Sequence, residues 1–570
     1  MNNWEISQIF YEIADLLDIL GENPYKSRAY RRAAHKLGNT YLDVEQLARE
    51  GRLQEIPGIG SALEKKIKEL ITTGRLGYRD NLRKKVPASL RQLLLIPGIG
   101  TKTVQILYQQ MEINDLIVLE AAAREKQLQK IPGIGVKTEE AILRGLETLA
   151  VRQRRLLLHH AFAFAQEIEG YLTGLPDITE VRTAGSLRRG KETIGDLDFA
   201  AAAVDPKSIV EAFTAAPFAQ DLVKVLDAQA TIMTRWGIQV NLLVVKPEFF
   251  PSALQHLTGS KEHNAALRGL AQERGWKINE YGIYQNAQVS APNTEDELYR
   301  QLGISFIPPE LREGGGEIEA AISGMLPDLV ETRDLKGDLH VHSEWSDGAN
   351  TLEKLALAAR ERGYQYLAIT DHSKSLHIAH GLTEERIQSQ REEIDRINKK
   401  YSDFRLLAGI EVEILTDGSL DFDDQLLAEM DLVVASVHSG FQQDKKTLTR
   451  RVVAALRNKN VDIVGHPTGR LLGRRDPYEI DIDFVLDVAA ETGTALEINS
   501  SPDRLDLRDQ NIRKGKRLGV RFAINTDAHD LHYFDDLQYG VLQARRGWAE
   551  KKDIVNTLSL HELDEWLHRN

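Results

Sequence analysis

The chain has 570 residues, which at roughly 100 to 200 residues per domain predicts several domains. Hydrophobic residues make up 42% and charged residues 28%, which excludes disordered and fibrous proteins. Because no apolar run approaches the roughly 18 residues that a bilayer requires, and because cysteine is absent, we expect a cytoplasmic protein without a membrane partner, whose metal sites use nitrogen and oxygen ligands. The net charge of -13 is unevenly spread: residues 51–110 hold 11 basic and 4 acidic residues, and 11 of 16 histidines follow residue 330. This pattern predicts a basic, phosphate-binding front and a histidine-rich, metal-binding rear.

The pentapeptide Ile-Pro-Gly-Ile-Gly occurs three times in the front, at 56–60, 96–100 and 131–135, and a helical pattern follows each copy. Paired glycines at a helix start let backbone N–H groups approach a phosphate closely. A single copy would be an ordinary helical hairpin turn, but three copies in a basic region resemble helix-hairpin-helix motifs, which grip the DNA backbone. The expected DNA-binding glycines are Gly58, Gly60, Gly98, Gly100, Gly133 and Gly135.

The middle of the chain, residues 151–327, mixes helix and strand patterns. Asp196 and Asp198 are two residues apart in a predicted strand, so their carboxylates share one face. Two like charges this close favour a cation between them, and the Gly-Ser turn at 185–186 is typical of a phosphate site. A solvated edge strand with two surface aspartates is the alternative.

Four motifs, at 185–190, 195–198, 258–260 and 278–281, follow the order and spacing of family X DNA polymerases, which this segment resembles. The resemblance implies that Asp196 and Asp198 are catalytic and carry Mg²⁺ or Mn²⁺, that Ser186 and Arg189 hold a deoxynucleoside triphosphate, and that Asn264 and Arg268 line the nascent base pair. The full set of implied nucleotide-binding residues is Gly185, Ser186, Arg189, Gly195, Gly259, Asn264 and Arg268.

The front of the chain extends this resemblance. Lys26, Tyr30 and Arg31 match positions that in family X bind a 5'-phosphate, and Lys66 matches the catalytic lysine that attacks a deoxyribose aldehyde as a Schiff base. The implied partner is therefore gapped or nicked DNA with a 5'-phosphate. One departure concerns Asn241, which stands where the family has its third catalytic carboxylate. Its amide can coordinate weakly through the carbonyl but lacks the charge that holds the catalytic metal, so we expect weakened nucleotidyl transfer.

The rear, residues 337–570, contains seven strand-like runs separated mostly by amphipathic helical patterns, which predicts a distorted (βα)7 barrel. Chemistry-bearing residues lie at or near the ends of these runs. In such a barrel the carboxyl ends of the strands converge on one face, so nine groups should meet in one cavity. They are His340, His342, Asp347, His372, Glu411, His438, His466, Asp527 and His529.

The motifs at 337–343, 369–373, 409–413, 465–467 and 525–529 resemble those of the PHP (polymerase and histidinol phosphatase) superfamily, whose members cleave phosphoesters on a trinuclear metal centre. The resemblance implies three divalent metals, manganese first with zinc or iron as alternatives. It implies one metal held by His340, His342, Glu411 and Asp527, a second held by Glu411, His438 and His466, and a third held by Asp347, His372 and His529. Arg470 is a candidate contact for the substrate phosphate.

Taken together, the motifs resemble bacterial family X DNA polymerases (PolX) with a C-terminal PHP domain. The fold class expected is an all-α helix-hairpin-helix region, an α+β nucleotidyltransferase-like polymerase core and an α/β PHP barrel. The expected domains are a lyase-like region at 1–80, further helix-hairpin-helix motifs at 81–150, a palm-like part at 151–245, a thumb-like part at 246–327, a linker at 328–336 and the PHP domain at 337–570.

The expected function is DNA repair: a metal-dependent 3'-5' exonuclease, also suited to abasic-site cleavage, joined to a gap-filling polymerase. The complete PHP ligand set favours the nuclease first and the polymerase second. Two alternatives remain, a PHP-type small-molecule phosphatase and a DNA clamp with a non-catalytic core. No protein partner is identified by the sequence.

Overall fold

The computed structural model describes residues 3–38, 44–56, 58–86, 90, 93, 96, 99–111, 113–131, 134–136, 138–140, 142–143, 146, 155–285 and 288–568. They belong to two compact units, Met1–Arg154 and Arg155–Asn570. Among the described residues, none of the helices has the length and apolar character needed to cross a membrane.

The first unit is helical. Its helices are α1 (Asn3–Ile19), α2 (Pro24–Gly38), α3 (Val44–Glu50), α4 (Ser61–Thr73), α5 (Gly77–Arg83), α7 (Thr101–Met111) and α8 (Leu116–Arg124). The isoleucines of the three pentapeptides are all buried in one core, which explains why both isoleucines recur in each copy. Those core isoleucines are Ile56, Ile59, Ile96, Ile99, Ile131 and Ile134.

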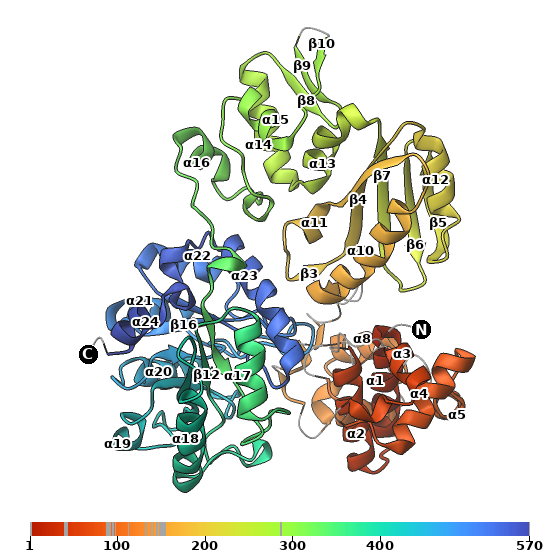
Figure 1. The fold of residues 1–570 in the computed structure, drawn as a ribbon. Coiled ribbons are helices and arrows are strands. Elements are labelled where there is room, and N and C mark those ends of the chain that lie inside the picture. Colours follow the sequence, from red (N-terminus) through yellow and green to blue (C-terminus); the bar gives the residue numbers. More distant parts are fainter. Residues whose placement is uncertain are drawn as a thin grey trace. The chain divides into compact units, whose positions relative to one another are not determined.

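The second unit begins with a five-stranded sheet in the order β2-β4-β7-β6-β5 (Figure 1). The strands are β2 (Ile178–Thr183), β4 (Asp196–Ala203), β5 (Ala219–Leu226), β6 (Gln229–Thr234) and β7 (Gln239–Val245). Only β4 and β7 pair in parallel, and their register sets Asn241 beside Asp198. The helices α10 (Leu158–Thr173), α11 (Gly185–Arg188) and α12 (Pro206–Thr214) accompany this sheet, and the short strands β1 (Leu156–Leu157) and β3 (Thr193–Ile194) pair with each other.

A smaller α+β part follows the sheet. It contains α13 (Phe250–Thr258), α14 (Lys261–Glu273), α15 (Glu295–Gln301) and α16 (Glu317–Ser323), with a three-stranded sheet of β8 (Lys277–Asn279), β9 (Gly282–Gln285) and β10 (Gln288–Ser290). The segment 328–336, predicted as a linker, buries Val330 and Leu335 in the hydrophobic core of the following barrel.

The rest of the second unit is a parallel barrel whose seven strands follow chain order. They are β11 (Gly337–Val341), β12 (Tyr366–Ile369), β13 (Arg405–Glu413), β14 (Leu432–Ser436), β15 (Ile463–Val464), β16 (Ala495–Asn499) and β17 (Phe522–Asn525). The first and last strands meet, because Val341 bridges Ala528 in parallel and the His342 N–H donates to the Ala528 carbonyl at 2.9 Å. The predicted barrel of seven parallel strands is confirmed.

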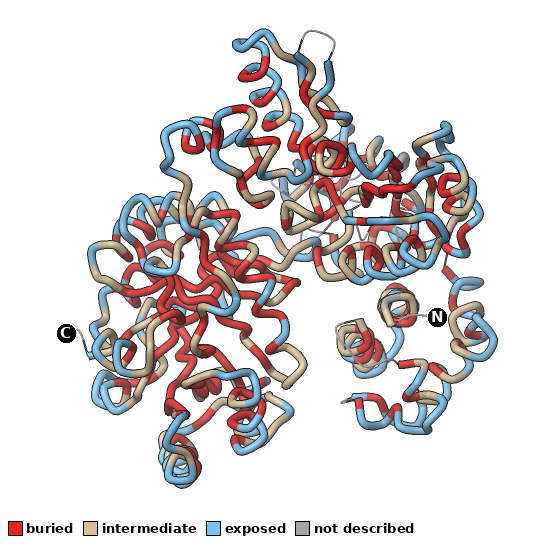
Figure 2. The backbone as a smooth tube through the Cα atoms, turned by 45° about the horizontal axis from the view of Figure 1, so that its top comes forward, coloured by how far each residue is buried: buried red, intermediate tan, exposed pale blue. Residues whose placement is uncertain are grey.

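Helices surround the barrel: α17 (Leu352–Glu361), α18 (Glu384–Asn398), α19 (Asp424–Leu427), α20 (Lys445–Leu456), α21 (Ile482–Thr492), α22 (Asp509–Leu518), α23 (Leu537–Arg546) and α24 (Leu560–Leu567). Buried residues follow the strands, and exposed residues lie on the outer turns of the helices (Figure 2). The strands are buried on both faces, as expected of a parallel sheet covered by helices.

Candidate metal centre and nucleotide site

The nine predicted donor residues lie at the carboxyl ends of the barrel strands, where the parallel fold brings them together. His340 and Glu411 belong to strands β11 and β13 themselves. The others follow strand ends by one to six residues, and they are His342, Asp347, His372, His438, His466, Asp527 and His529.

Glu411 lies at the centre of this cluster and is 1% exposed. Its Oε1 is 3.4 Å from His340 Nε2, 3.3 Å from His438 Nε2 and 3.2 Å from His466 Nε2. Its Oε2 is 2.7 Å from His372 Nδ1. Burial alone would raise the pKa of this carboxyl, but the surrounding histidines hold that pKa well below its usual range. Glu411 therefore carries a negative charge. Glu411 and the four histidines around it come from five strands of the barrel or from the segments that directly follow them.

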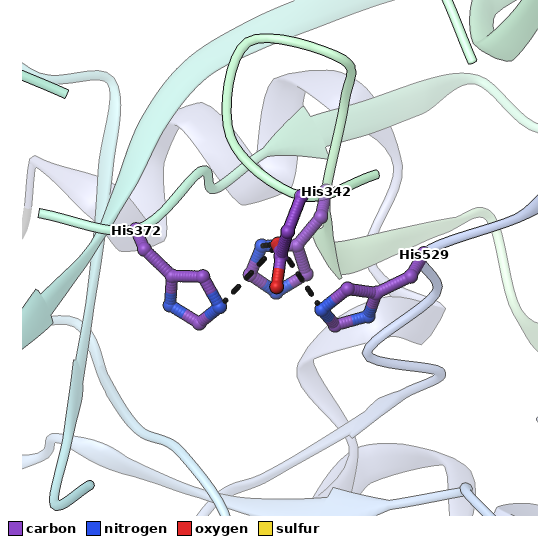
Figure 3. A group of neighbouring side chains, drawn as sticks. His342, His372 and His529 are labelled. Carbon is purple, nitrogen blue, oxygen red and sulfur yellow. Dashed lines mark ion pairs between the residues drawn. The ribbon is translucent and has the colours of Figure 1, made fainter. Parts of the chain in front are cut away.

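A second group gathers around Asp347, whose Oδ1 is 3.3 Å from His529 Nε2, 3.6 Å from His372 Nε2 and 3.9 Å from His342 Nδ1. The three imidazoles are drawn in Figure 3. Burial, together with the positive charges of His529 and His372, lowers the pKa of His342 to about 3. The His342 ring is therefore neutral at physiological pH, which is the form that binds a metal.

A third group is formed by His340, His342 and Asp527, with His342 Nε2 3.1 Å from Asp527 Oδ1. The backbone at Asp527 has a φ of 55° and that at His466 a φ of 26°. This left-handed region costs a residue with a side chain about 1 to 3 kcal/mol and persists where the surrounding structure fixes it. The strain lies at two of the nine donor residues, so the barrel holds them in place at an energetic cost.

The cluster fits divalent cations. Six buried donor atoms have no hydrogen bond within the described chain: His340 Nε2, His342 Nδ1, His372 Nδ1, His466 Nδ1 and both carboxylate oxygens of Glu411. A buried polar atom without a partner costs about 1 to 3 kcal/mol, and a cation would remove that cost. Protons compete for the same donors, because the charges of Glu411 and Glu413 outweigh burial and raise the pKa of His438 to about 10.

The grouping of donors differs from the one implied by resemblance. The three groups whose donor atoms lie within 4.8 Å of one another share His342 and His372. The sequence assignment gave each of these histidines to one metal only. The groups are His342, Asp347, His372 and His529; His340, His342 and Asp527; and His372, Glu411 and His438.

Two further glutamates, which the sequence analysis did not assign, orient these donors. Glu497 accepts a hydrogen bond at 2.7 Å from His340 Nδ1 and one at 2.6 Å from the backbone N–H of His466. Glu413 lies 2.8 Å from His438 Nδ1. A carboxylate on Nδ1 fixes the tautomer and turns Nε2 toward the cluster. The available signal was their position: each is a carboxylate inside a buried strand, β16 and β13 respectively.

Arg470, the candidate contact for the substrate phosphate, makes hydrogen bonds to other protein groups. Its side chain is 2% exposed, and its Nη2 donates to Glu192 Oε2 at 2.7 Å and to the Leu505 carbonyl. This arginine braces the loop at 505 instead.

The polymerase-like site is built on β4 and β7. Asn241 Nδ2 is 3.1 Å from Asp196 Oδ2 and 2.9 Å from Asp198 Oδ1, so the amide donates to both carboxylates. Its Oδ1 accepts from Thr231 Oγ1 at 3.0 Å and from Gln239 Nε2 at 3.2 Å. The carbonyl that was expected to coordinate a metal is thus turned away from the carboxylates.

Burial and the neighbouring Asp196 raise the pKa of Asp198 to about 6. Gly185 packs directly on this carboxylate: a Cβ there would lie 2.0 Å from Asp198 Oδ2, and its φ is 59°. Only glycine satisfies both conditions. Ser186 follows in α11, and at Gly195 an added Cβ would lie 3.0 Å from Arg155 Nη1.

Two of the other residues predicted to contact the nucleotide, Arg189 and Asn264, make hydrogen bonds or ion pairs within the protein. Arg189 pairs with Glu313 at 3.0 Å and also donates to the Thr258 carbonyl, beside Gly259. Asn264 accepts from Gln255 at 2.9 Å and donates to the His256 carbonyl at 2.7 Å. Arg268, on the same helix α14, is exposed.

In the first unit, Lys26 and Lys66 share one aromatic neighbour. Lys26 Nζ lies 5.0 Å and Lys66 Nζ 5.2 Å from the ring centroid of Tyr78, and Tyr30 stacks on Tyr78 at 6.0 Å. Tyr78 was not predicted. Arg31, by contrast, has its charge taken up by two aspartates of α1, at 2.7 and 2.8 Å.

The described glycines of the pentapeptides, Gly58, Gly60, Gly100 and Gly135, are exposed, and a Cβ added at any of them would meet nothing within 4 Å. The backbone φ of 89° favours glycine at Gly58. At the other three described positions packing does not demand glycine, whereas close approach of a phosphate would. Gly98 and Gly133 lie outside the described residues.

Comparison with known proteins is consistent with this architecture. Residues 1–76 match a helix-hairpin-helix domain, and 90–148 match a SAM-like helix-hairpin-helix tandem. Residues 253–313 match the DNA polymerase beta thumb, and 338–501 match the PHP domain.

One curated relative aligns end to end. The "DNA polymerase/3'-5' exonuclease PolX" of Bacillus subtilis (strain 168) is 40% identical over 574 aligned residues, covering 100% of both chains. The chain belongs to the PolX family. The predicted enzyme class, a DNA polymerase joined to a 3'-5' exonuclease, is thereby confirmed.

Other relatives of this PolX chain match only part of it. A "probable phosphatase" of Caldanaerobacter subterraneus subsp. tengcongensis is 30% identical over 217 residues, 35% of this chain and 79% of the relative. One from Syntrophotalea carbinolica is 32% identical over 213 residues, 35% of this chain and 83% of its own.

Proposed function

We propose that this PolX enzyme trims DNA 3' ends in its PHP domain, where the nine clustered residues hold three divalent cations, and fills short gaps with its polymerase core. We expect manganese first, with zinc or iron as alternatives. The observation that carries the proposal is Glu411, a buried carboxylate whose two oxygens lie among imidazoles without any hydrogen bond in the described chain. Such a group needs cations.

Bound divalent metals would make water nucleophilic at neutral pH and stabilise charge on the phosphate. The protein supplies the positions. Glu497 and Glu413 hold the Nδ1 atoms of His340 and His438, so each Nε2 faces Glu411. The strained backbone at Asp527 and His466 fixes two more donors. The same donor cluster would suit phosphodiester cleavage at an abasic site, which is part of this proposal.

In the polymerase core, Asp196 and Asp198 would hold Mg²⁺ or Mn²⁺ with the triphosphate of a deoxynucleotide. Gly185, Ser186, Arg189, Gly195 and Gly259 border that site, and Asn264 and Arg268 would face the base pair. Asn241 offers its amide hydrogens, rather than a negative charge, to the two carboxylates. We propose that this weakens nucleotidyl transfer while leaving triphosphate binding.

The front of the chain would hold the 5' side of the gap. Lys26, Tyr30 and Lys66 surround Tyr78, a cationic and aromatic group that suits a 5'-phosphate. The exposed pentapeptide glycines would contact the backbone, and Lys66 would be the Schiff-base nucleophile. Arg31 contributes less, because Asp15 and Asp18 already neutralise it. A cytoplasmic location belongs to the same proposal.

The test is a one-nucleotide-gapped duplex with a 5'-labelled primer, incubated with Mn²⁺ and then with Mn²⁺ plus deoxynucleotides. Shortening of the primer without nucleotides, and slow extension with them, are expected. A matched duplex without the 5'-phosphate tests the gap contact and should bind more weakly. Phosphate release from small phosphomonoesters, without any change in primer length, would instead favour the small-molecule phosphatase. Tight gap binding with neither shortening nor extension would favour a clamp.

A further inference from the structure

The loop 500–507, between β16 and α22, is fixed firmly beside the metal cluster. Asp506 accepts from the Thr468 N–H at 2.9 Å and from Thr468 Oγ1 at 2.8 Å, which ties the loop to the segment after His466. Arg470 donates to the carbonyl of Leu505. Arg504 lies directly before these two anchored residues, so its backbone is held in place beside them.

The positive charge of Arg504 has little compensation among the described residues. Its Nε is 3.6 Å from Asp527 Oδ2, a long ion pair, and its guanidinium has no hydrogen bond within the described chain. The carboxylates of its own loop are occupied, Asp503 by Arg474 at 3.6 Å and Asp506 by Thr468. The side chain is 20% exposed, so a ligand can reach it.

A second arginine adds to the positive charge. Arg475 stacks its guanidinium on Phe441 at 4.3 Å, and its Nε donates to the Gly469 carbonyl at 2.8 Å. Burial and the charge of Arg504 both lower the pKa of Arg475, so the two guanidinium groups lie near enough to interact. Positive charges placed this close repel each other, and bound cations would increase the repulsion. An anionic ligand between them removes that cost.

We propose that Arg504 contacts a non-bridging oxygen of the phosphodiester that the PHP cluster cleaves. This deepens the exonuclease function proposed above and rests on it. Arg504 stands beside Asp527, one of the nine donors, so a phosphate at the cluster comes within its reach. A guanidinium donates two charge-assisted hydrogen bonds to a phosphate and cannot lose its proton. The contact with the substrate phosphate that was expected of Arg470 is thus assigned to Arg504. Arg470 stabilises the loop that carries Arg504 by donating to the Leu505 carbonyl.

Arg504→Ala and Arg504→Lys test this in the full-length, manganese-loaded protein. Arg508→Ala is the matched control, since Arg508 is exposed, lies four residues further along and loses the same charge. Two substrates are compared, a 5'-labelled single-stranded oligonucleotide and bis(p-nitrophenyl) phosphate. Binding of thymidine 5'-monophosphate by calorimetry, metal content and melting temperature provide readouts that do not depend on turnover.

We expect Arg504→Ala to lower kcat/KM by about 100-fold on both substrates, with unchanged metal content. Thymidine monophosphate should bind to Arg504→Ala about tenfold more weakly than to the wild type. Arg504→Lys should restore part of both kcat/KM and this binding, and Arg508→Ala should match the wild type. A loss on the oligonucleotide alone would contradict contact with the reacting phosphate.

Wild-type rates for Arg504→Ala, or a loss explained by missing metal, would overturn the inference. If the alanine variant does not fold, Arg504→Gln replaces it with the same readouts. A wild-type protein that cleaves the small diester through Arg504 but leaves oligonucleotides intact would overturn the exonuclease proposal and leave this contact standing. If the wild type and Arg504→Ala shorten DNA equally well, the exonuclease proposal stands and this contact is overturned.

Discussion

The two carboxylate sites of the second unit solve the same electrostatic problem differently. In the polymerase core, the Asn241 amide donates to both Asp196 and Asp198, so neutral hydrogen bonds hold the like charges together. In the barrel, Glu411 has imidazoles on all sides and no hydrogen bond to either oxygen within the described chain. The carboxylates of the first site have hydrogen-bond partners within the chain, whereas both oxygens of Glu411 lack one, an arrangement that suits bound cations.

The strongest test of this contrast is Glu411→Gln. It removes the shared charge of the barrel cluster, so we expect at least about a 1000-fold loss of exonuclease rate and loss of bound metal, measured by primer shortening and elemental analysis. Glu344→Gln, an exposed glutamate near the same cluster, is the control. Retained metal and rate in the Glu411 variant would show that the donors are not organised around this carboxylate.

A smaller effect is expected from Glu497→Gln, which keeps the shape of the side chain but removes the charge behind His340 and His466. Loss of such outer support weakens metal affinity by about 10 to 100-fold. Titration of the metal-free protein with Mn²⁺ measures it, with the exposed Glu491→Gln on α21 as the control. Equal affinities for the two variants would contradict the orienting role.

Asn241→Asp converts the self-satisfied site into one that needs a cation. We expect nucleotide incorporation with Mg²⁺ to rise on the order of tenfold, because the added carboxylate helps to hold the catalytic metal. The melting temperature should also become more dependent on Mg²⁺. Gln229→Glu adds the same charge at an exposed position of the same sheet and should do neither. Unchanged incorporation would mean that Asn241 is not the limiting group.

The smallest expected effect concerns Glu313. Its carboxylate pairs with Arg189, which borders the polymerase-like site, and with Arg546 on helix α23 of the barrel. Burial opposes ionisation, but Arg546, Arg189 and Lys191 lower the pKa of Glu313 to about 2. Its stabilisation is therefore complete above the pKa of the unfolded chain, near 4.5, and is lost as the pH falls toward about 2.

Glu313→Gln should destabilise the protein by about 1 kcal/mol at neutral pH, after a discount for partial exposure. The difference in melting temperature between this variant and the wild type should stay constant from about pH 7 to about pH 5 and narrow as the pH falls from about 4.5 toward about 2. A difference that does not vary with pH would assign the effect to shape rather than charge. Glu319→Gln, exposed on α16, is the control.

Much of the barrel site could be predicted, because parallel βα units bring strand ends together and the donors recur at those ends. The places of Glu411 and His438 in the cluster could be predicted from the positions of their strands alone. The sharing of His342 and His372 between groups could not be predicted, since it depends on side-chain direction and on the path of the loop that carries Asp347. The sequence pattern alone does not show which partner a buried carboxylate such as Glu497 accepts from.

Closeness along the chain was the least reliable guide. Arg470 lies only four residues after His466. The backbone turns at His466, where φ is 26°, and the side chain of Arg470 extends to Glu192. Arg504, much further along, lies beside the cluster because its loop is tied to the same segment. The contact of Arg31 with a 5'-phosphate stays a prediction, and in the structure its ion-pair partners come from the neighbouring helix α1.

The meeting of β11 with β17 also bears on how the protein is made. His340 and His342 leave the ribosome almost two hundred residues before Asp527 and His529, and until the last strand docks against the first, the donor set is open on one side. A chain that ends before β17 therefore lacks Asp527 and His529, two of the nine donors, although it contains the whole helix-hairpin-helix region.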